Sequence, residues 1–143
     1  MTAPFVIEPH DAVDNGVAQV NIMLEPGRAE GFAIFISTYP GFSGGPPAHH
    51  HHSYDEAFYV LSGEMEFCVD GQTALVPTGS MAWVPHGTTH AFRNPSPDPA
   101  RVMITTTPGA IDLVVNMPHD KNPDTMRTWF AKHDSQVDGP PLG

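Results

Sequence analysis

Sixteen prolines and thirteen glycines are spread along the 143 residues and divide the chain into short apolar runs. Proline and glycine both disfavour the interior of a helix, so long helices do not fit between them. Short runs rich in Val, Ile and Phe, separated by turn residues, are typical of a compact all-β fold. The breakers are not gathered into a linker, and 143 residues suit one core. We therefore expect a single domain over residues 1–143.

The strand-like runs follow one another closely along the chain. The clearest is EMEFCVDG, in which Met65, Phe67 and Val69 point one way and polar residues point the other. Asp70-Gly71, directly after it, is a strong hairpin signal. Eight or so such strands predict a sandwich or a small barrel. The runs cover residues 17–26, 31–40, 56–63, 64–71, 72–77, 81–85, 90–94 and 101–108.

The C-terminal third departs from this pattern. Residues 111–117 fit either a strand or a helix. A short helix is expected over about 122–133, because Asn122 can cap it and Pro123 suits its first position. Met126, Trp129 and Phe130 would form its apolar face and pack on the barrel. The tail 138–143, DGPPLG, is expected to be a loop.

Charge and cysteine usage limit the partners and the compartment. Sixteen acidic against six basic residues give a formal charge of -10, which argues against nucleic acid and anionic membranes as partners. Cys68 stands alone, so neither an intramolecular disulfide nor a thiolate metal cluster can form. The N-terminus lacks a basic patch followed by an apolar run. We expect a cytoplasmic protein.

Four consecutive histidines, residues 49–52, lie inside the chain, where a purification tag is not expected. Residues i and i+2 of a strand face the same side, so either His49 and His51 or His50 and His52 can chelate one ion. Glu56 follows at the start of the next strand and can add a carboxylate oxygen. Imidazole and carboxylate are common metal ligands. The residues alone leave both registers open.

This stretch resembles the first motif of the cupin family. That motif has a His-x-His pair, a glutamate three or four residues later and a glycine after six more, and here Glu56 and Gly63 take the last two places. The stretch PPAHHHHSYDEAFYVLSGE is most similar to cupins with the longer gap. The resemblance therefore favours His49 and His51 as the chelating pair.

Residues 79–94, GSMAWVPHGTTHAFRN, resemble the second cupin motif at every position: Gly79, Pro85, Gly87, His90 and Asn94. The resemblance covers about residues 30–108. It implies a small double-stranded β-helix, or jelly-roll barrel, with the C-terminal helix outside this core. It also implies one divalent metal ion held by His49, His51, Glu56 and His90. The role of His86, inside the same motif, stays open.

The subgroup that the chain most resembles is the single-domain, quercetin-2,3-dioxygenase-like cupins. This implies a metal-dependent dioxygenase acting on a flavonol-like or other enolic small molecule, with dioxygen as co-substrate and Glu56 as proton acceptor. Iron(II), nickel, manganese and cobalt fit such ligands; zinc would indicate a non-redox cyclase or isomerase. A non-catalytic binding protein is the third reading. The expected apolar substrate pocket consists of Phe58, Val60, Met65, Phe67, Trp83 and Phe92.

The N-terminal strands are apolar, and edge strands of such barrels can pair between subunits. We therefore expect a homodimer.

Overall fold

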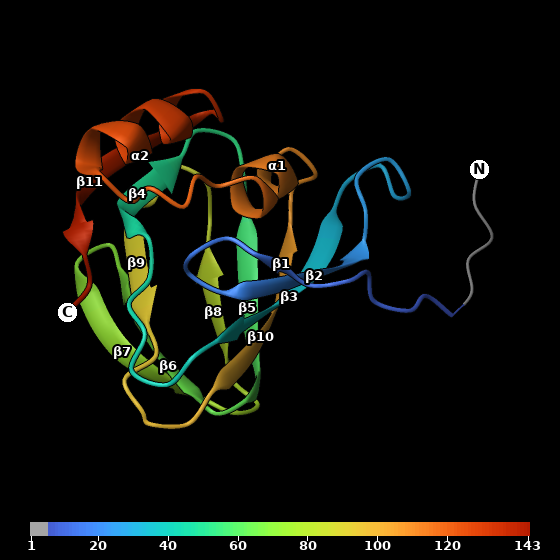
Figure 1. Cartoon of the computed structure of the whole chain (residues 1–143), viewed down its shortest axis with the longest axis horizontal. Helices are drawn as coiled ribbons and strands as arrows, with labels where there is room; N and C mark the ends of the chain where they lie inside the picture. The colour runs from blue at the N-terminus through green and yellow to red at the C-terminus, as the bar shows by residue number, and fades with distance from the viewer. Residues whose placement is uncertain (1–5) are drawn as a thin grey trace.

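The computed structural model describes residues 6–143, which form strands and two helices (Figure 1). The helices are Ala110–Val115 (α1) and Pro123–Ala131 (α2). The strands are Val13–Asp14 (β1), Gln19–Leu24 (β2), Ala33–Tyr39 (β3), Pro47–His51 (β4), Glu56–Ser62 (β5), Glu64–Val69 (β6), Gln72–Pro77 (β7), Met81–Val84 (β8), His90–Arg93 (β9), Ala100–Thr106 (β10) and Ser135–Pro141 (β11).

Two antiparallel sheets build the barrel. One has the strand order β1-β2-β3-β10-β5-β8, and the other has the order β11-β4-β9-β6-β7. Between β3 and β10 the chain passes repeatedly from one sheet to the other, which winds it into a jelly roll (Figure 1). The expected all-β jelly-roll barrel with a short C-terminal helix is confirmed.

The barrel core comes from the inward positions of alternating strands. In β3, buried and partly buried residues alternate without a break. Val60 of β5 and Val102 and Ile104 of β10 are completely buried. Burial of each such side chain contributes about 1.5–3 kcal/mol, so this interior stabilises the barrel strongly.

The β6–β7 hairpin forms where the sequence predicts it. Asp70 and Gly71 both have positive φ angles, 52° and 77°. A two-residue hairpin of type I′ requires this conformation at both positions, and Asp-Gly adopts it readily. The hairpin places Met65 and Phe67 inside the barrel.

The C-terminal region contains two helices. Residues 110–115 form α1, which includes most of the segment 111–117 that fitted either a strand or a helix. In α2 the side chain of Asn122 accepts a hydrogen bond from the Asp124 backbone N–H at 2.9 Å, and Pro123 occupies the first turn. Met126 and Phe130 of this helix are buried.

The expectation that the C-terminal tail is a loop is wrong. Residues 135–141 form β11, which pairs with β4 and sets Ser135 opposite His51 and Val137 opposite His49. β11 is an edge strand with irregular register at its C-terminal end. Proline is tolerated on an edge because no neighbour needs its missing N–H. The local composition therefore concealed a strand.

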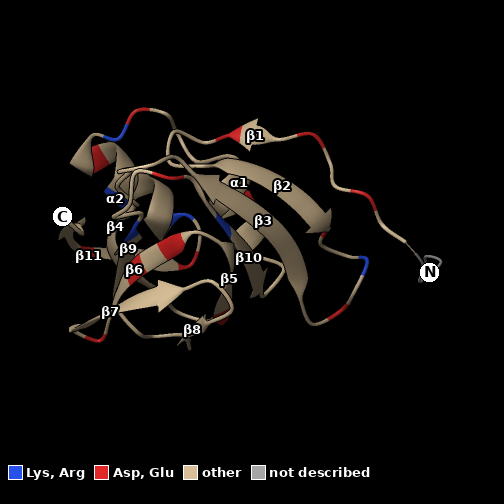
Figure 2. Cartoon of the chain, turned by 90° about the horizontal axis from the view of Figure 1, so that it is seen from below, with Lys and Arg blue, Asp and Glu red and all other residues tan. Residues whose placement is uncertain are grey.

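The distribution of charge and the length of the helices bear on which partners and surroundings suit the molecule. Acidic residues are distributed over strands, helices and loops along the chain (Figure 2). Neither helix in the part of the chain described is long and apolar enough to span a bilayer.

Asn94, the last residue of the second motif, fastens two loops at the base of the barrel. Its side-chain amide donates to the carbonyl oxygens of Tyr39 (3.3 Å), Pro40 (3.0 Å) and Asp98 (2.7 Å). Its Oδ1 accepts from the Ser96 backbone N–H at 3.0 Å. Asn94 is only 1% exposed, so these bonds form away from water.

Replacing Asn94 by alanine should therefore lower the free energy of unfolding by about 2–4 kcal/mol, because several polar groups lose their partner. Urea unfolding followed by circular dichroism measures this. Asn116→Ala is the control, since Asn116 is exposed and should change the free energy by less than about 1 kcal/mol. Equal effects of the two substitutions would contradict the role assigned to Asn94.

Candidate metal centre

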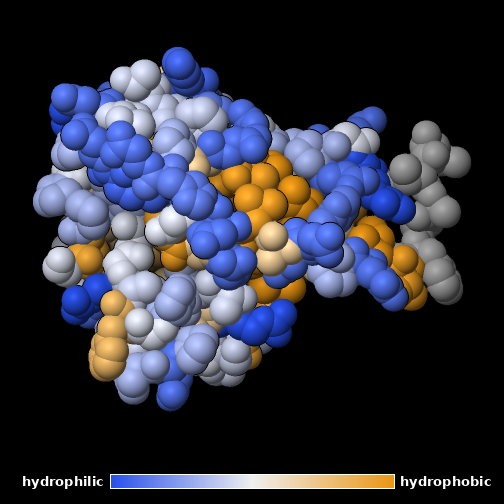
Figure 3. Space-filling view, in the orientation of Figure 1, coloured by the Kyte–Doolittle hydropathy of each residue, from blue (hydrophilic) through white to orange (hydrophobic). Residues whose placement is uncertain are grey.

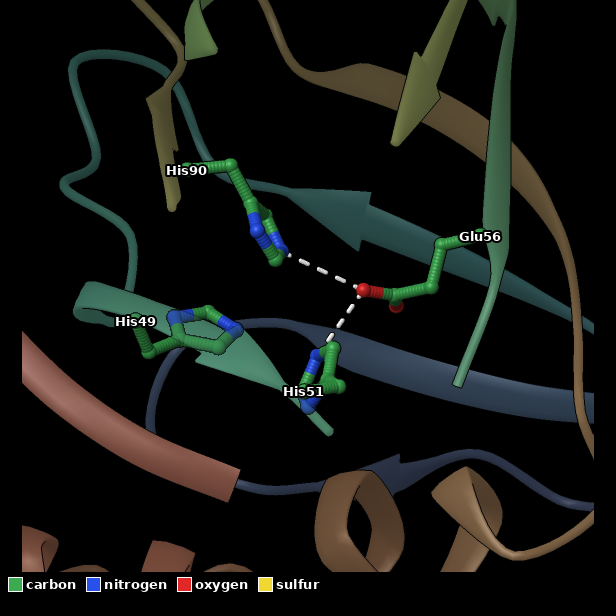
Figure 4. Close-up of side chains that lie close together, drawn as sticks. All are labelled: His49, His51, Glu56 and His90. Carbon is green, nitrogen blue, oxygen red and sulfur yellow. Dashed lines mark ion pairs between the residues drawn. The ribbon is translucent and has the colours of Figure 1, made fainter. Parts of the chain in front are cut away.

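Three histidines and one glutamate from three strands meet at one point inside the barrel (Figure 4). β4 and β9 pair so that His49 lies directly opposite His90. His51 is two residues further along the same face of β4, and Glu56 begins β5 in the other sheet. All four residues are buried, and one ligand atom from each lies within 4.8 Å of the others.

Backbone carbonyls fix the tautomers of two of these histidines. His49 Nδ1 lies 2.7 Å from Pro47 O, and His90 Nδ1 lies 3.0 Å from Thr88 O. A carbonyl oxygen can only accept, so each Nδ1 carries a hydrogen, and in the neutral ring that metal binding requires each Nε2 keeps its lone pair. Both Nε2 atoms are therefore prepared to bind a cation.

A hydroxyl group fixes the third tautomer. Ser135 Oγ donates its hydrogen to the carbonyl oxygen of His133 at 2.8 Å. The same oxygen lies 2.6 Å from His51 Nδ1 and must therefore accept a hydrogen from it. In the neutral ring, His51 Nε2 then keeps its lone pair as well.

The free lone pairs leave buried polar atoms unsatisfied unless a cation is present. Glu56 Oε1 lies 2.9 Å from His51 Nε2 and 3.2 Å from His90 Nε2. Glu56 Oε1 and His90 Nε2 are buried and lack a hydrogen-bond partner. Buried polar atoms without a partner are costly. A divalent metal with three imidazole ligands and one carboxylate would satisfy all of them, and the residues fit such an ion.

Burial and mutual contact set the protonation of the cluster. Burial raises the pKa of Glu56, but His51 and His90 beside it outweigh this effect and hold that pKa well below its ordinary value. Burial, with His90 and His51 nearby, lowers the pKa of His49 well below its ordinary value. Burial also lowers the pKa of His90, but the contact with Glu56 is stronger and the net shift is upward. An anionic Glu56 and a neutral His49 are the forms that bind a metal.

A cavity of about 50 Å³ adjoins the four residues. A space of this size has room for only a few water molecules. Phe58 and Phe92 supply aromatic walls, and Ser37 and Tyr39 of β3 line another side. Burial raises the pKa of the Tyr39 phenol, so it stays protonated and can donate a hydrogen bond.

The structure separates the residues that the sequence assigned to one substrate pocket. Phe58 and Phe92 line the cavity. Val60, Met65 and Phe67 are buried in the barrel core but do not line it.

The assignment of Trp83 to this pocket is wrong, because Trp83 is 53% exposed on the outside of the barrel. Pairing between β5 and β8 sets Glu56 opposite Val84 and Ala57 opposite Trp83. Val84 shares the inward face with Glu56, so the alternation of the strand turns Trp83 outward.

The remaining histidines of the two motifs lie outside the cluster. His50 faces away from the cavity, with its Nδ1 2.7 Å from Asp138 Oδ2, and His52 is exposed. The structure thus brings together His49 and His51, the pair that the resemblance favoured. His86, whose role was open, is exposed and lies 2.8 Å from Asp55 Oδ1.

Sequence reasoning missed three polar residues near the cluster. Ser37 and Tyr39 could have been found, since they share the inward face of β3 with Phe35 at a spacing of two. Ser135 gave no such signal, because it contacts His51 across 84 residues of chain.

Replacing Ser135 by alanine should weaken metal binding about 10- to 100-fold, because the acceptor that orients His51 is lost. Titration with cobalt(II), followed by calorimetry, measures the change. Ser53→Ala is the matched control, since Ser53 is exposed and bonds Asp134 on the surface. Unchanged affinity in Ser135→Ala would remove Ser135 from the support of the site.

The jelly roll and its buried cluster define a class of small barrels with a candidate metal site between the two sheets. Residues 35–106, about half of the chain, match the family described as the cupin domain. The chain belongs to the cupin family.

The chain matches only part of the length of its sequence relatives. Quercetin 2,3-dioxygenase of Bacillus subtilis is 31% identical over 105 residues, which is 71% of this chain and 31% of that protein. An uncharacterised protein of Streptomyces coelicolor is 37% identical over 57 residues, 40% of this chain and 53% of that protein. The chain thus spans less than a third of the first relative and about half of the second.

Solved structures agree on the fold. KdgF from a Halomonas species superposes with a TM-score of 0.61 at 24% identity, covering 69% of this chain and 86% of that one. The polyketide cyclase RemF from Streptomyces resistomycificus gives 0.59 at 17% identity, covering 76% and 80%.

Proposed function

We propose that this cupin is a metal-dependent dioxygenase acting on a flavonol-like or other enolic small molecule. The observation that carries the proposal is the buried cluster of three histidines, each with a free Nε2, facing one carboxylate. The similarity of the chain to quercetin 2,3-dioxygenase, over 71% of its length, supports a redox reaction.

The cluster supplies both the ligands and a base. His49, His51, Glu56 and His90 would hold one divalent ion, which supplies Lewis acidity and, if it is redox-active, a path for electrons between an enolate and dioxygen. Glu56 is anionic and accepts the proton of the substrate hydroxyl. Phe58 and Phe92 exclude water from the reacting atoms. The Tyr39 hydroxyl can donate a hydrogen bond to a substrate oxygen.

The overall reaction needs no external reductant. The enolate is the electron donor and dioxygen is the oxidant, and both oxygen atoms enter the product. The substrate proton moves to Glu56 and is returned to the product or to solvent.

Oxygen consumption tests the proposal. Protein loaded with iron(II), nickel, manganese or cobalt should consume dioxygen in the presence of a flavonol and place both atoms of ¹⁸O₂ in the product. If the metal-loaded protein binds flavonols but neither consumes oxygen nor converts them, it is a binding protein and the dioxygenase proposal is wrong.

The same ligands also favour a second function. Zinc accepts imidazole and carboxylate ligands but has no redox couple, so it would support a non-redox cyclase or isomerase. Turnover of an enolic substrate by the zinc-loaded protein under strict anaerobiosis would establish that reading in place of the first.

We also propose a homodimer, with contact near the N-terminal strands. β1 lies at the free edge of the six-stranded sheet, where its backbone can pair with another chain. Light scattering should give the mass of two chains, and a mass of 15.5 kDa would rule the dimer out.

A further inference from the structure

The cavity beside the cluster is too small for the substrate proposed above. It measures about 50 Å³, whereas sites for drug-sized ligands usually measure about 300–1,000 Å³. A three-ring flavonol therefore cannot lie wholly inside it. Most of such a molecule needs another place.

A second cavity of about 650 Å³ lies next to the first. We call it the outer groove; it is bounded by residues 44–47, the segment between α1 and α2, the start of α2 and β11. Val17, Pro46 and Met117 line both cavities. These three residues therefore form the wall between the cluster and the outer groove.

The side chains of this wall differ in flexibility. Pro46 is a rigid ring, but Met117 has an unbranched, flexible side chain that adapts to different neighbours. Met117 lies just after α1 and is only 6% exposed. Apolar surface gathers in the middle of the face shown in Figure 3. Met117 is therefore the residue of the shared wall whose side chain is most able to move.

The lining of the outer groove favours a flat apolar ligand. Five of its residues are prolines, which present rigid apolar rings and have no N–H: Pro46, Pro47, Pro123, Pro140 and Pro141. Glycines at 44, 45 and 139 leave its floor open. Aromatic rings are the ligand surface that such walls cover best.

Of the three charged side chains that line the groove, one forms no ion pair within residues 6–143. Asp138 contacts His50 and Thr89, and Arg127 forms an ion pair with Asp124. Lys121 Nζ instead donates to the carbonyl oxygens of Asn15 (2.7 Å) and Pro118 (2.5 Å), and within residues 6–143 it forms no ion pair. An ammonium group in this setting attracts an anionic substituent.

From these contacts we propose that the outer groove is the second half of the substrate site. The enolic end of the substrate reaches the cluster past Met117, and its remaining rings lie in the groove with an anionic substituent near Lys121. The substrate class is thus an extended aromatic enol that carries an acidic group. This inference rests on the proposed function, because it takes the cluster to bind the enolic end.

Two probes with the same chelating group separate the halves of the site. Maltol and 3-hydroxyflavone share a hydroxypyranone, but only the flavone carries rings that extend beyond it. Nickel-loaded wild-type protein should bind 3-hydroxyflavone at least about tenfold more tightly than maltol in calorimetry, since the extra rings bury apolar surface.

Gly44→Phe tests the groove without disturbing the metal ligands. A Cβ at Gly44 meets no atom within 4 Å, and its φ is not in the left-handed region, so the phenyl ring can occupy the groove. The substitution should weaken 3-hydroxyflavone binding about tenfold and leave maltol binding and nickel content unchanged. Gly31→Phe is the matched control, because Gly31 is equally unobstructed and lies outside the groove; it should change neither affinity.

The charge is tested with a ring-sulfonated 3-hydroxyflavone. At low salt the wild type should bind it several-fold more tightly than the neutral parent, and 0.5 M NaCl should remove the difference. Lys121→Gln should abolish this preference, whereas Lys132→Gln, which changes the net charge equally outside the groove, should keep it. A preference that survives in Lys121→Gln, or that high salt leaves intact in the wild type, would refute the role of Lys121.

The outcomes distinguish the two proposals. If neither probe binds the nickel-loaded wild type, the cluster does not accept enolic ligands and the proposed function fails. If both bind but the flavone gains nothing over maltol, or Gly44→Phe affects both equally, the groove is not part of the site and the proposed function stands.

Discussion

Replacing His90 by alanine should lower the affinity for divalent metal at least about 100-fold, an effect larger than that of losing an outer contact. His90 supplies one of the three free Nε2 atoms and lies opposite His49 on the neighbouring strand. Its loss leaves fewer ligands and a gap beside Glu56 Oε1. Elemental analysis of freshly purified protein, followed by cobalt(II) titration, measures the change.

His52→Ala is the matched control for this prediction. His52 belongs to the same run of histidines but is exposed and lies outside the cluster. Its substitution should leave metal content unchanged. If His90→Ala keeps full occupancy in a folded protein, or His52→Ala loses it, the cluster described here does not hold the metal.

Replacing Glu56 by glutamine should reduce turnover of an enolic substrate about 100- to 10,000-fold, the range that general base catalysis contributes. The amide is nearly the same size and still offers an oxygen ligand, but it cannot accept the substrate proton. Metal content and the rate of oxygen consumption are measured on the same sample, so that loss of the ion and loss of the base are told apart.

Glu30→Gln provides the control, because Glu30 is an exposed carboxylate outside the cluster and should leave the rate unchanged. Full turnover by Glu56→Gln at intact metal content would show that Glu56 acts only as a ligand. If Glu56→Gln also loses the metal, the main role of Glu56 is to bind the metal and not to accept the proton.

Much of this architecture is encoded locally. Strict alternation over residues 64–69 predicts β6, and Asp70-Gly71 predicts the turn after it. The Asn122–Pro123 pair predicts where α2 begins. Each of these signals depends on residues close together in the chain, whose backbone preferences act before any distant contact forms.

The four residues of the cluster could also be anticipated, because their spacing follows the two cupin motifs. The choice between His49/His51 and His50/His52 could not be made from the residues alone, since a slip of one residue exchanges the faces of a strand. In the structure the pairing of His49 with His90 sets this register.

Periodicity and motif spacing run along the chain, so the all-β barrel, its hairpins and the residues able to bind a metal can be predicted without the structure. Tertiary structure alone decided that Trp83 faces outward, that residues 135–141 form a strand and that Ser135 fixes the tautomer of His51. It also decided the size of the cavity and its shared wall with the outer groove. These features arise from contacts between segments far apart in sequence. The register of a short edge strand is set by pairing with its neighbour and not by its own composition.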